Sequence, residues 1–175
     1  MSGIAEPEGS CGTCVVCCQW LDIETEGLSK KAGVLCQHCV GGGCGIYETR
    51  PNLCRGFFCG WRLLPKLGED WRPDRSGILI LSVEKDLPPQ YHGAQIGFNF
   101  VVLGGEAAIT RPGFAEYLSL LVSRKVAVYL SADSPKTLIN EYLEPLTADI
   151  PGTTGMLLHI YGLHLEAKKA GLVPK

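Results

Sequence analysis

Cys11-Gly-Thr-Cys14-Val-Val-Cys17-Cys18 opens the stretch of sequence that decides how the first part of this chain folds. All nine cysteines of the 175 residues fall between Cys11 and Cys59. The set is Cys11, Cys14, Cys17, Cys18, Cys36, Cys39, Cys44, Cys54 and Cys59. The number is odd, and residues 1–10 lack the basic start and the apolar core of a signal peptide. Metal ligation therefore explains the thiols better than a disulfide framework does, and we predict that these nine cysteines form a metal site.

Composition and charge narrow the class of protein. Hydrophobic residues make up 46% of the chain and charged residues 19%, which supports a folded core and argues against disorder. The formal net charge is −2 and no lysine- or arginine-rich block occurs, so we expect no nucleic-acid partner. No apolar run approaches the roughly 18 residues that span a bilayer. These features predict a cytoplasmic protein with no membrane partner, and they leave a protein partner open.

The first three cysteines have the C-x2-C-x2-C spacing that supplies three ligands to a cubane cluster in bacterial ferredoxins. The sequence departs from the ferredoxin pattern at Cys18, which follows Cys17 directly. Neighbouring side chains diverge along most backbones, so we expect that Cys17 and Cys18 do not chelate one zinc ion together. One of them then serves a second metal or a multi-iron cluster. After this run we expect an extended segment at 20–25 and a short helix that Ser29 caps.

The second group of thiols begins with Cys36-Gln-His-Cys39, a C-x2-C pair that is common at tetrahedral zinc. His38 is either a ligand or an exposed loop residue. The glycines at 41–43 are expected to adopt positive φ and to direct N–H groups at sulfur. Cys44, Cys54 and Cys59 complete this group.

Two arginines, Arg50 and Arg55, flank the later cysteines in the sequence. Four thiolates around a divalent ion leave a net charge near −2, which nearby guanidinium groups would offset. The alternative is that both are ordinary surface arginines, and the sequence does not separate these two interpretations.

These spacings together resemble the YkgJ-like cysteine-cluster family, which is described as a zinc- or iron-chelating domain. The resemblance covers residues 11–59 and includes the string Ile46-Tyr-Glu-Thr-Arg50-Pro-Asn-Leu-Cys54-Arg55. It implies metal chelation and no particular reaction. The resemblance implies eight ligands, with Cys39 as the additional thiol. The eight are Cys11, Cys14, Cys17, Cys18, Cys36, Cys44, Cys54 and Cys59.

The fold class predicted for the whole chain is α+β. We expect a cysteine-rich metal-binding module at 1–60, a connecting segment at 61–76 and a body at 77–175, packed as one compact unit. The body is predicted to be a small mixed β-sheet with about three helices. Strands are expected at 78–83, 97–103, 106–110 and 126–130, with Gly104-Gly105 as a hairpin turn. Helices are expected from Pro112, from Ser134 to Pro145, and from Thr153 or Thr154 to the last turn at Lys168 and Lys169.

Two functions compete on these observations. The first is an intracellular metal-binding protein whose cysteines chelate iron, including an iron–sulfur cluster, or zinc, with a redox or metal-handling role. The second is a structural zinc module that supports a partner- or ligand-binding α+β domain. His159 and His164 stand five residues apart, off the i,i+4 spacing of a helical metal pair, and are expected to be partly buried. Whether the chain is an enzyme is left undecided, because no catalytic motif occurs.

Overall fold

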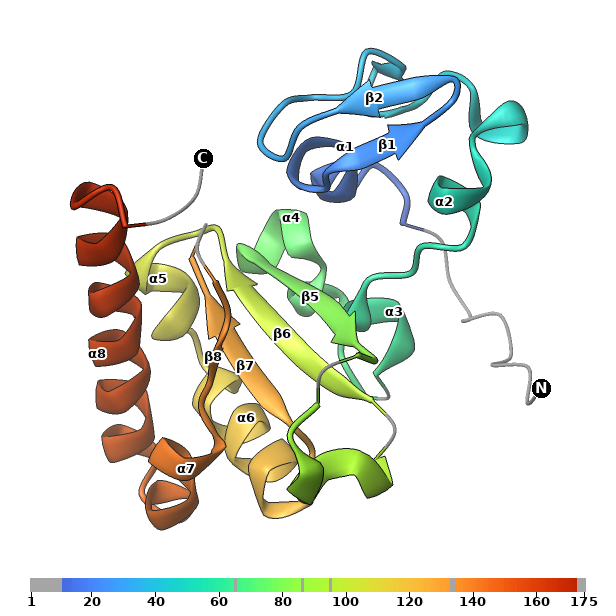
Figure 1. The fold of residues 1–175 in the computed structure, drawn as a ribbon. Helices are drawn as coiled ribbons and strands as arrows, with labels where there is room; N and C mark the ends of the chain where they lie inside the picture. Colours follow the sequence, from blue (N-terminus) through green and yellow to red (C-terminus); the bar gives the residue numbers. More distant parts are fainter. Residues whose placement is uncertain (1–10, 65, 86, 95, 133–134, 173–175) are drawn as a thin grey trace. The chain divides into compact units, whose positions relative to one another are not determined.

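The computed structural model describes residues 11–64, 66–85, 87–94, 96–132 and 135–172, and Figure 1 shows its fold. The chain is α+β, as predicted. It divides into two compact units, Met1–Arg75 and Ser76–Lys175, which we call the cysteine unit and the body.

The cysteine unit contains short elements. Its helices and helical turns are α1 (Val16–Trp20), η1 (Tyr47–Thr49), α2 (Asn52–Arg55), α3 (Gly60–Leu63) and η2 (Glu69–Trp71), and α4 (Pro73–Ser76) crosses into the body. Its strands are β1 (Ile23–Thr25), β2 (Leu28–Lys30), β3 (Cys39–Val40) and β4 (Gly43–Cys44), paired as two antiparallel hairpins. Gly41 and Gly42, which connect β3 to β4, have φ values of +57° and +78°, as expected, whereas Gly43 belongs to strand β4 and does not have a positive φ.

The short helix expected after Ser29 is wrong, because Ser29 lies in strand β2 opposite Glu24 of β1. The Ser29 hydroxyl donates to the Glu24 carboxylate across the hairpin at 2.7 Å, so it does not act as a helix cap. Ile23 and Leu28 project to the buried face of the same hairpin. This alternation of buried and exposed side chains stabilises a strand, and it outweighs the local cap signal.

Few apolar side chains are buried in the cysteine unit. One cluster joins Ile23, Leu28 and Cys36, with Cys18, Leu21, Cys39 and Cys54 packed against it. Thiols therefore occupy positions that aliphatic side chains fill in an ordinary core. A unit built this way buries little apolar area for its length, which is typical of modules that depend on metal or disulfide cross-links.

The body is organised around one mixed sheet with the strand order β5-β6-β7-β8. Its strands are β5 (Ile78–Val83), β6 (Gly97–Val102), β7 (Val128–Ser131) and β8 (Thr137–Leu138). β6 pairs antiparallel with β5 and parallel with β7, and β8 pairs antiparallel with β7. The strands expected at 78–83, 97–103 and 126–130 are confirmed within two residues at each end.

The expected hairpin at Gly104-Gly105 is wrong, because the chain leaves the sheet there and enters α5 (Glu106–Ile109). The carbonyl of Gly77 accepts hydrogen bonds from the N–H groups of Leu103 and Gly104, at 2.8 and 2.9 Å. A Cβ on Gly77 would lie 2.7 Å from the Gly104 Cα atom, so the two backbones touch at this point. The glycine pair thus permits a close backbone crossing, not a two-residue turn.

Three further helices belong to the body in Figure 1: α6 (Phe114–Ser123), α7 (Asn140–Leu143) and α8 (Ile150–Lys169). The body also contains the helical turns η3 (Pro89–Ala94) and η4 (Glu144–Leu146). α8 packs against α5, α6 and strand β7. Phe100 of β6 and Phe114 of α6, both fully buried, meet edge to face with ring centroids 5.9 Å apart.

The helix expected over 134–145 is mostly wrong, because Thr137–Leu138 forms edge strand β8 and only α7 and the turn η4 follow it. Ser134, the expected cap, lies outside the described residues. The reason is the fully buried Asn140. Its Oδ1 accepts from the Val128 N–H and its Nδ2 donates to the Val126 carbonyl, both at 2.8 Å. These bonds hold the segment against β7 as a sheet edge.

The last helix begins at Ile150, earlier than expected, because the Asp149 side chain caps it by accepting from the Gly152 N–H at 3.0 Å. Its expected end is confirmed, with Lys168 and Lys169 in the last turn and Gly171 at φ +68° beyond it. Over the described part of the chain, no helix combines the length and apolar character needed to cross a membrane.

Candidate metal centre in the cysteine unit

All nine cysteines carry free thiols. Cys36 and Cys59 are buried and the other seven are half-buried. Within the described ranges, no three His, Cys, Asp or Glu side chains are arranged to hold a metal ion. The thiols nevertheless lie close enough to shift one another's pKa values, and these mutual effects divide them into two groups.

The front group is formed by Cys11, Cys14, Cys17 and Cys59. Burial is the main reason that the pKa of Cys59 is raised to about 11, and Cys11 and Cys14 act in the same direction. A hydrogen bond from Cys18 lowers the pKa of Cys17, while the charges of Cys11, Cys14 and Cys59 act against that lowering. Cys59, the last of the nine cysteines, is therefore assigned to the same group as the first three. Sequence spacing alone did not reveal this grouping.

Backbone N–H groups surround the front group. Turns close at Cys11–Cys14, where the Cys14 N–H donates to the Cys11 carbonyl at 3.0 Å, and after Cys59, where the Arg62 N–H donates to the Cys59 carbonyl at 2.9 Å. The N–H groups of Arg62 and Trp61 act against the rise in the pKa of Cys59. Such donors stabilise a thiolate over a thiol, which is the form that binds metal.

The rear group is formed by Cys18, Cys36, Cys39, Cys44 and Cys54. Cys39 and Cys44 stand directly opposite each other in the β3–β4 hairpin. The Cys36 N–H donates to the Cys18 carbonyl and the Cys39 N–H donates to the Cys36 carbonyl, both at 2.9 Å. Burial raises the pKa of Cys54, and the charges of Cys36, Cys18 and Cys44 raise it further. Five thiols from four separate segments therefore share one neighbourhood.

Cys17 and Cys18 join the two groups. A hydrogen bond from the Cys18 thiol lowers the pKa of Cys17, and the same bond is the main cause of the raised pKa of Cys18. The two thiols are therefore within hydrogen-bonding reach, although adjacent side chains were expected to diverge. Their other neighbours differ, however, because Cys17 faces the front group and Cys18 faces Cys39 of the rear group. The adjacent pair thus contributes one thiol to each group.

A hollow of about 280 Å³, which we call the thiol hollow, lies against the rear group. Five thiols line it, those of Cys17, Cys18, Cys36, Cys44 and Cys54, and most of the rest of its wall is apolar. His38 also lines it, half-buried at the rim, with its Nε2 atom 3.3 Å from the Gln37 side-chain nitrogen. The donor chemistry suits soft thiophilic metals, and the space admits a cluster of several atoms as well as a single ion. The thiols fit such a group in kind and neighbourhood, although in this conformation they do not converge.

Two cations favour ionisation of the rear thiols. Arg50 lines the thiol hollow, and its charge acts against the rise in the pKa of Cys54. Lys30 is buried and its ammonium donates to the carbonyl oxygens of Gln19, Leu21 and Lys31, while its charge acts against the rise in the pKa of Cys18. Sequence reasoning missed Lys30. The only available signal was its place two residues after Leu28, on the inward face of a strand.

Arg55 differs from Arg50 in its surroundings. Its Nε atom donates to the Arg50 carbonyl at 3.0 Å, and its terminal nitrogen donates to the Glu48 carbonyl. Of the two interpretations left open by the sequence, charge compensation of the thiols is supported for Arg50. Arg55 instead holds the loop that carries Arg50.

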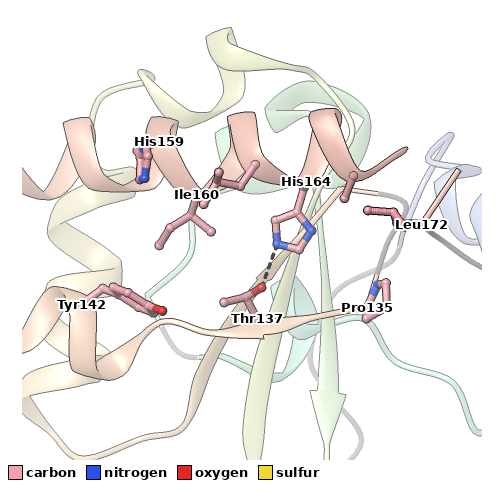
Figure 2. A pocket seen from close by; sticks show the side chains of 9 residues that line it. Pro135, Thr137, Tyr142, His159, Ile160, His164 and Leu172 are labelled. Atoms are coloured by element: carbon pink, nitrogen blue, oxygen red, sulfur yellow. Dashed lines mark hydrogen bonds between the residues drawn. The ribbon is translucent and has the colours of Figure 1, made fainter. Parts of the chain in front are cut away.

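The body contains a separate hollow of about 330 Å³ between α8 and strand β8 (Figure 2). Thr137 Oγ1 and the Nε2 atom of the buried His164 form a hydrogen bond of 3.0 Å across it. Burial lowers the pKa of His164. His159 lies on the same helix and is exposed, so the expectation of partly buried histidines is confirmed for His164 alone. The wall is mainly apolar and indicates no ligand class.

A scan against family models found no match to this chain, and searches of curated proteins and of solved structures found none either.

Proposed function

We propose that this chain is a metal-binding protein whose cysteine unit holds iron, including iron in an iron–sulfur cluster, or zinc. The observation that carries the proposal is the division of nine free thiols into a front group of four and a rear group of five. Because burial and neighbouring groups raise the pKa values of five of these thiols, they are protonated without metal, and a bound cation would stabilise the thiolates that ligate it. Two tetrathiolate sites would use eight of the nine.

The front site would be held by Cys11, Cys14, Cys17 and Cys59, and the rear site by Cys18, Cys36, Cys44 and Cys54. Cys39 is the additional rear thiol, in agreement with the resemblance to the YkgJ-like cysteine-cluster family. Bound iron would supply one-electron exchange, and bound zinc would supply a redox-inert cross-link. The chain's own contribution is to orient the thiols, offset their charge through Arg50 and Lys30, and surround the rear site with apolar side chains.

Different features favour the two metals. The contact between Cys17 and Cys18 and the size of the thiol hollow favour a multi-iron cluster that bridges the groups. The all-thiolate composition of each proposed four-ligand site favours tetrahedral zinc. With iron, we propose a redox or metal-handling role in the cytoplasm.

The second candidate function is a structural zinc module that supports a partner- or ligand-binding body. The observation in its favour is the small apolar core of the cysteine unit, where thiols replace aliphatic side chains. Zinc binding would then contribute folding free energy, on the order of 10 kcal/mol.

Anaerobic purification of the full chain, followed by metal analysis, an absorption spectrum and an assay for acid-labile sulfide, tests both candidates. Coloured protein with iron and labile sulfide supports the cluster. Colourless protein with stoichiometric zinc and no sulfide supports the structural role. Protein that is folded and holds neither metal would contradict the proposal.

A further inference from the structure

The hairpin of β3 and β4 places two cysteines opposite each other. Cys39 of β3 is the direct partner of Cys44 of β4. The chain turns between them through Gly41 and Gly42, whose positive φ angles suit the favoured two-residue hairpin turn. Because a turn of this length fixes the register of the strands, the backbone of residues 39–44 alone sets the pairing of the two cysteines.

The hydrogen-bond pattern of the hairpin decides how close the two cysteines are. The Gly45 N–H donates to the His38 carbonyl at 2.8 Å, so the neighbouring pair is a hydrogen-bonded one. Hydrogen-bonded and non-hydrogen-bonded pairs alternate along an antiparallel ladder, and Cys39 and Cys44 therefore form a non-hydrogen-bonded pair. The Cα atoms of such a pair are about 4.5 Å apart, within the range of roughly 4.4 to 6.8 Å that a disulfide spans. The hairpin can therefore accept a disulfide between these residues without moving its backbone.

Cys18 is a second neighbour of Cys39, because their thiols share a hydrogen bond. This contact joins two segments that are distant in sequence, and it depends on the fold of the whole cysteine unit. The contact with Cys44 lasts as long as the hairpin does, and the short connection keeps the local concentration of the Cys44 thiol high. Cys44 is therefore the favoured partner of Cys39 for a covalent bond.

The two cysteines have different roles in the proposed metal site, on which this inference rests. Cys44 is one of the four proposed rear ligands, and Cys39 is the additional thiol. Both are half-buried, so a small molecule in solution can reach them. We propose that Cys39 is oxidised by low-molecular-weight disulfides, that it ends in a disulfide with Cys44, and that this bond releases the rear metal. Transient disulfides of this kind are typical of redox-sensing proteins in reducing compartments.

The reaction consists of two thiol–disulfide exchanges. The Cys39 thiolate attacks one sulfur of the small disulfide RSSR, forms a mixed disulfide and releases one RS⁻, which takes the Cys39 proton. The Cys44 sulfur then leaves the metal and attacks the Cys39 sulfur, which forms the protein disulfide and releases the second RS⁻. The two cysteines lose two electrons and RSSR gains them. Cys18, Cys36 and Cys54 remain at the rear, one thiol fewer than a tetrathiolate site needs.

Incubation of the anaerobically purified full chain with oxidised glutathione tests the inference. Burial raises the pKa of Cys39, so a mildly alkaline buffer is used to ionise more of this thiol. Mass spectrometry of alkylated peptides maps the disulfides, and metal analysis after desalting measures the bound metal. We expect a Cys39–Cys44 disulfide and loss of about half of the metal, the rear share if the two sites are separate tetrathiolates. Pairing of Cys39 with Cys18, an unmodified Cys39, or full retention of metal beside the Cys39–Cys44 bond would overturn the inference.

Two variants separate the steps. Cys39→Ser lacks the reacting thiol and should keep its metal under the same treatment, so metal loss as fast as in the parent would overturn the inference. Cys44→Ser cannot complete the second exchange and should retain glutathione on Cys39, which its mass reports whether or not the rear metal is bound.

Metal content before incubation distinguishes the two ways to fail. Folded protein that holds no metal contradicts the proposed metal function. Metal-loaded protein in which Cys39 and Cys44 do not become linked contradicts the oxidation site alone.

Discussion

Different neighbours influence the pKa values of individual cysteines, and these neighbours assign each cysteine to the front group or the rear group. Burial raises the pKa values of Cys14, Cys54 and Cys59. Cys11 adds to the rise at Cys14, and Cys11 and Cys14 add to the rise at Cys59, whereas rear thiols add to the rise at Cys54. Cys39 shares the rear neighbourhood but would be the fifth thiol for four positions.

Single replacements should therefore remove metal from one group at a time. Cys14→Ser should lose the front site and Cys54→Ser the rear site, each with about half of the metal of the parent, if the two sites are separate tetrathiolates. Metal analysis of the purified variants provides the measurement.

Cys39→Ser is the matched control and should keep the full metal content. Loss of metal from Cys39→Ser, together with retention in Cys54→Ser, would show that Cys39 is a ligand and Cys54 the additional thiol. Full retention in all three variants would contradict the assignment altogether.

His164 makes the body sensitive to acid. Because burial lowers its pKa in the folded state, the unfolded chain binds a proton more readily. This contribution to stability is complete above the ordinary histidine pKa of about 6.5 and is lost as pH falls through the lower, folded-state value. The free energy of unfolding, followed by circular dichroism of the helices, should therefore decline below about pH 6.5.

His164→Gln should show a flatter decline, because glutamine can still bond to Thr137 and does not titrate. His159→Gln, at the exposed histidine of the same helix, should keep the slope of the parent. Identical slopes in all three proteins would exclude His164 as the source.

The roles of some single residues could be predicted from the sequence, and the roles of others could not. Spacing identified the cysteines as candidate ligands, and their binding of metal stays a prediction. Buried Lys30 and the carbonyl-bound Arg55 were not assigned, because their roles depend on backbone atoms that a hairpin and a helical loop bring near. No local pattern encodes such contacts.

At the scale of elements, strands with continuous apolar runs were predictable and short connections were not. Residues 78–83 form β5 as expected, since a continuous apolar run of this length is more typical of a buried strand than of a helix. The segment before Asn140 forms a sheet edge because the Asn140 side chain forms hydrogen bonds to Val128, the first residue of β7, and to Val126, which precedes the strand. Its partners are 12 and 14 residues away in sequence, so a local helix signal could not reveal them.

Asn140→Ala tests this account of the β8 edge. It leaves the Val128 N–H and the Val126 carbonyl buried without partners, which should lower the free energy of unfolding by about 3 kcal/mol. Chemical denaturation followed by circular dichroism measures the change. Glu141→Ala, at the exposed next residue of α7, should change it by less than about 0.5 kcal/mol. Equal effects of the two substitutions would show that the Asn140 bonds do not hold the edge.

At the scale of the whole molecule, the two units differ in the kinds of side chain that stabilise them. The body has fully buried aliphatic and aromatic side chains on its sheet and helices, and the cluster of the cysteine unit combines three aliphatic side chains with four thiols. Metal removal should therefore unfold the cysteine unit and leave the body folded.

The tryptophans allow this to be followed by fluorescence. All three, Trp20, Trp61 and Trp71, belong to the cysteine unit, and the long helices α6 and α8 belong to the body. A strong chelator should shift tryptophan emission toward the red while most helical circular dichroism persists. A red shift of tryptophan emission together with loss of the helical circular dichroism would mean that the two units unfold together.

X-ray absorption spectroscopy at the metal edge of anaerobically purified protein tests the central claim most directly, because it reports the atoms bound to the metal. The proposal predicts a first shell of sulfur, about four atoms at about 2.3 Å. A first shell of nitrogen and oxygen alone, or no metal edge in folded protein, would contradict it.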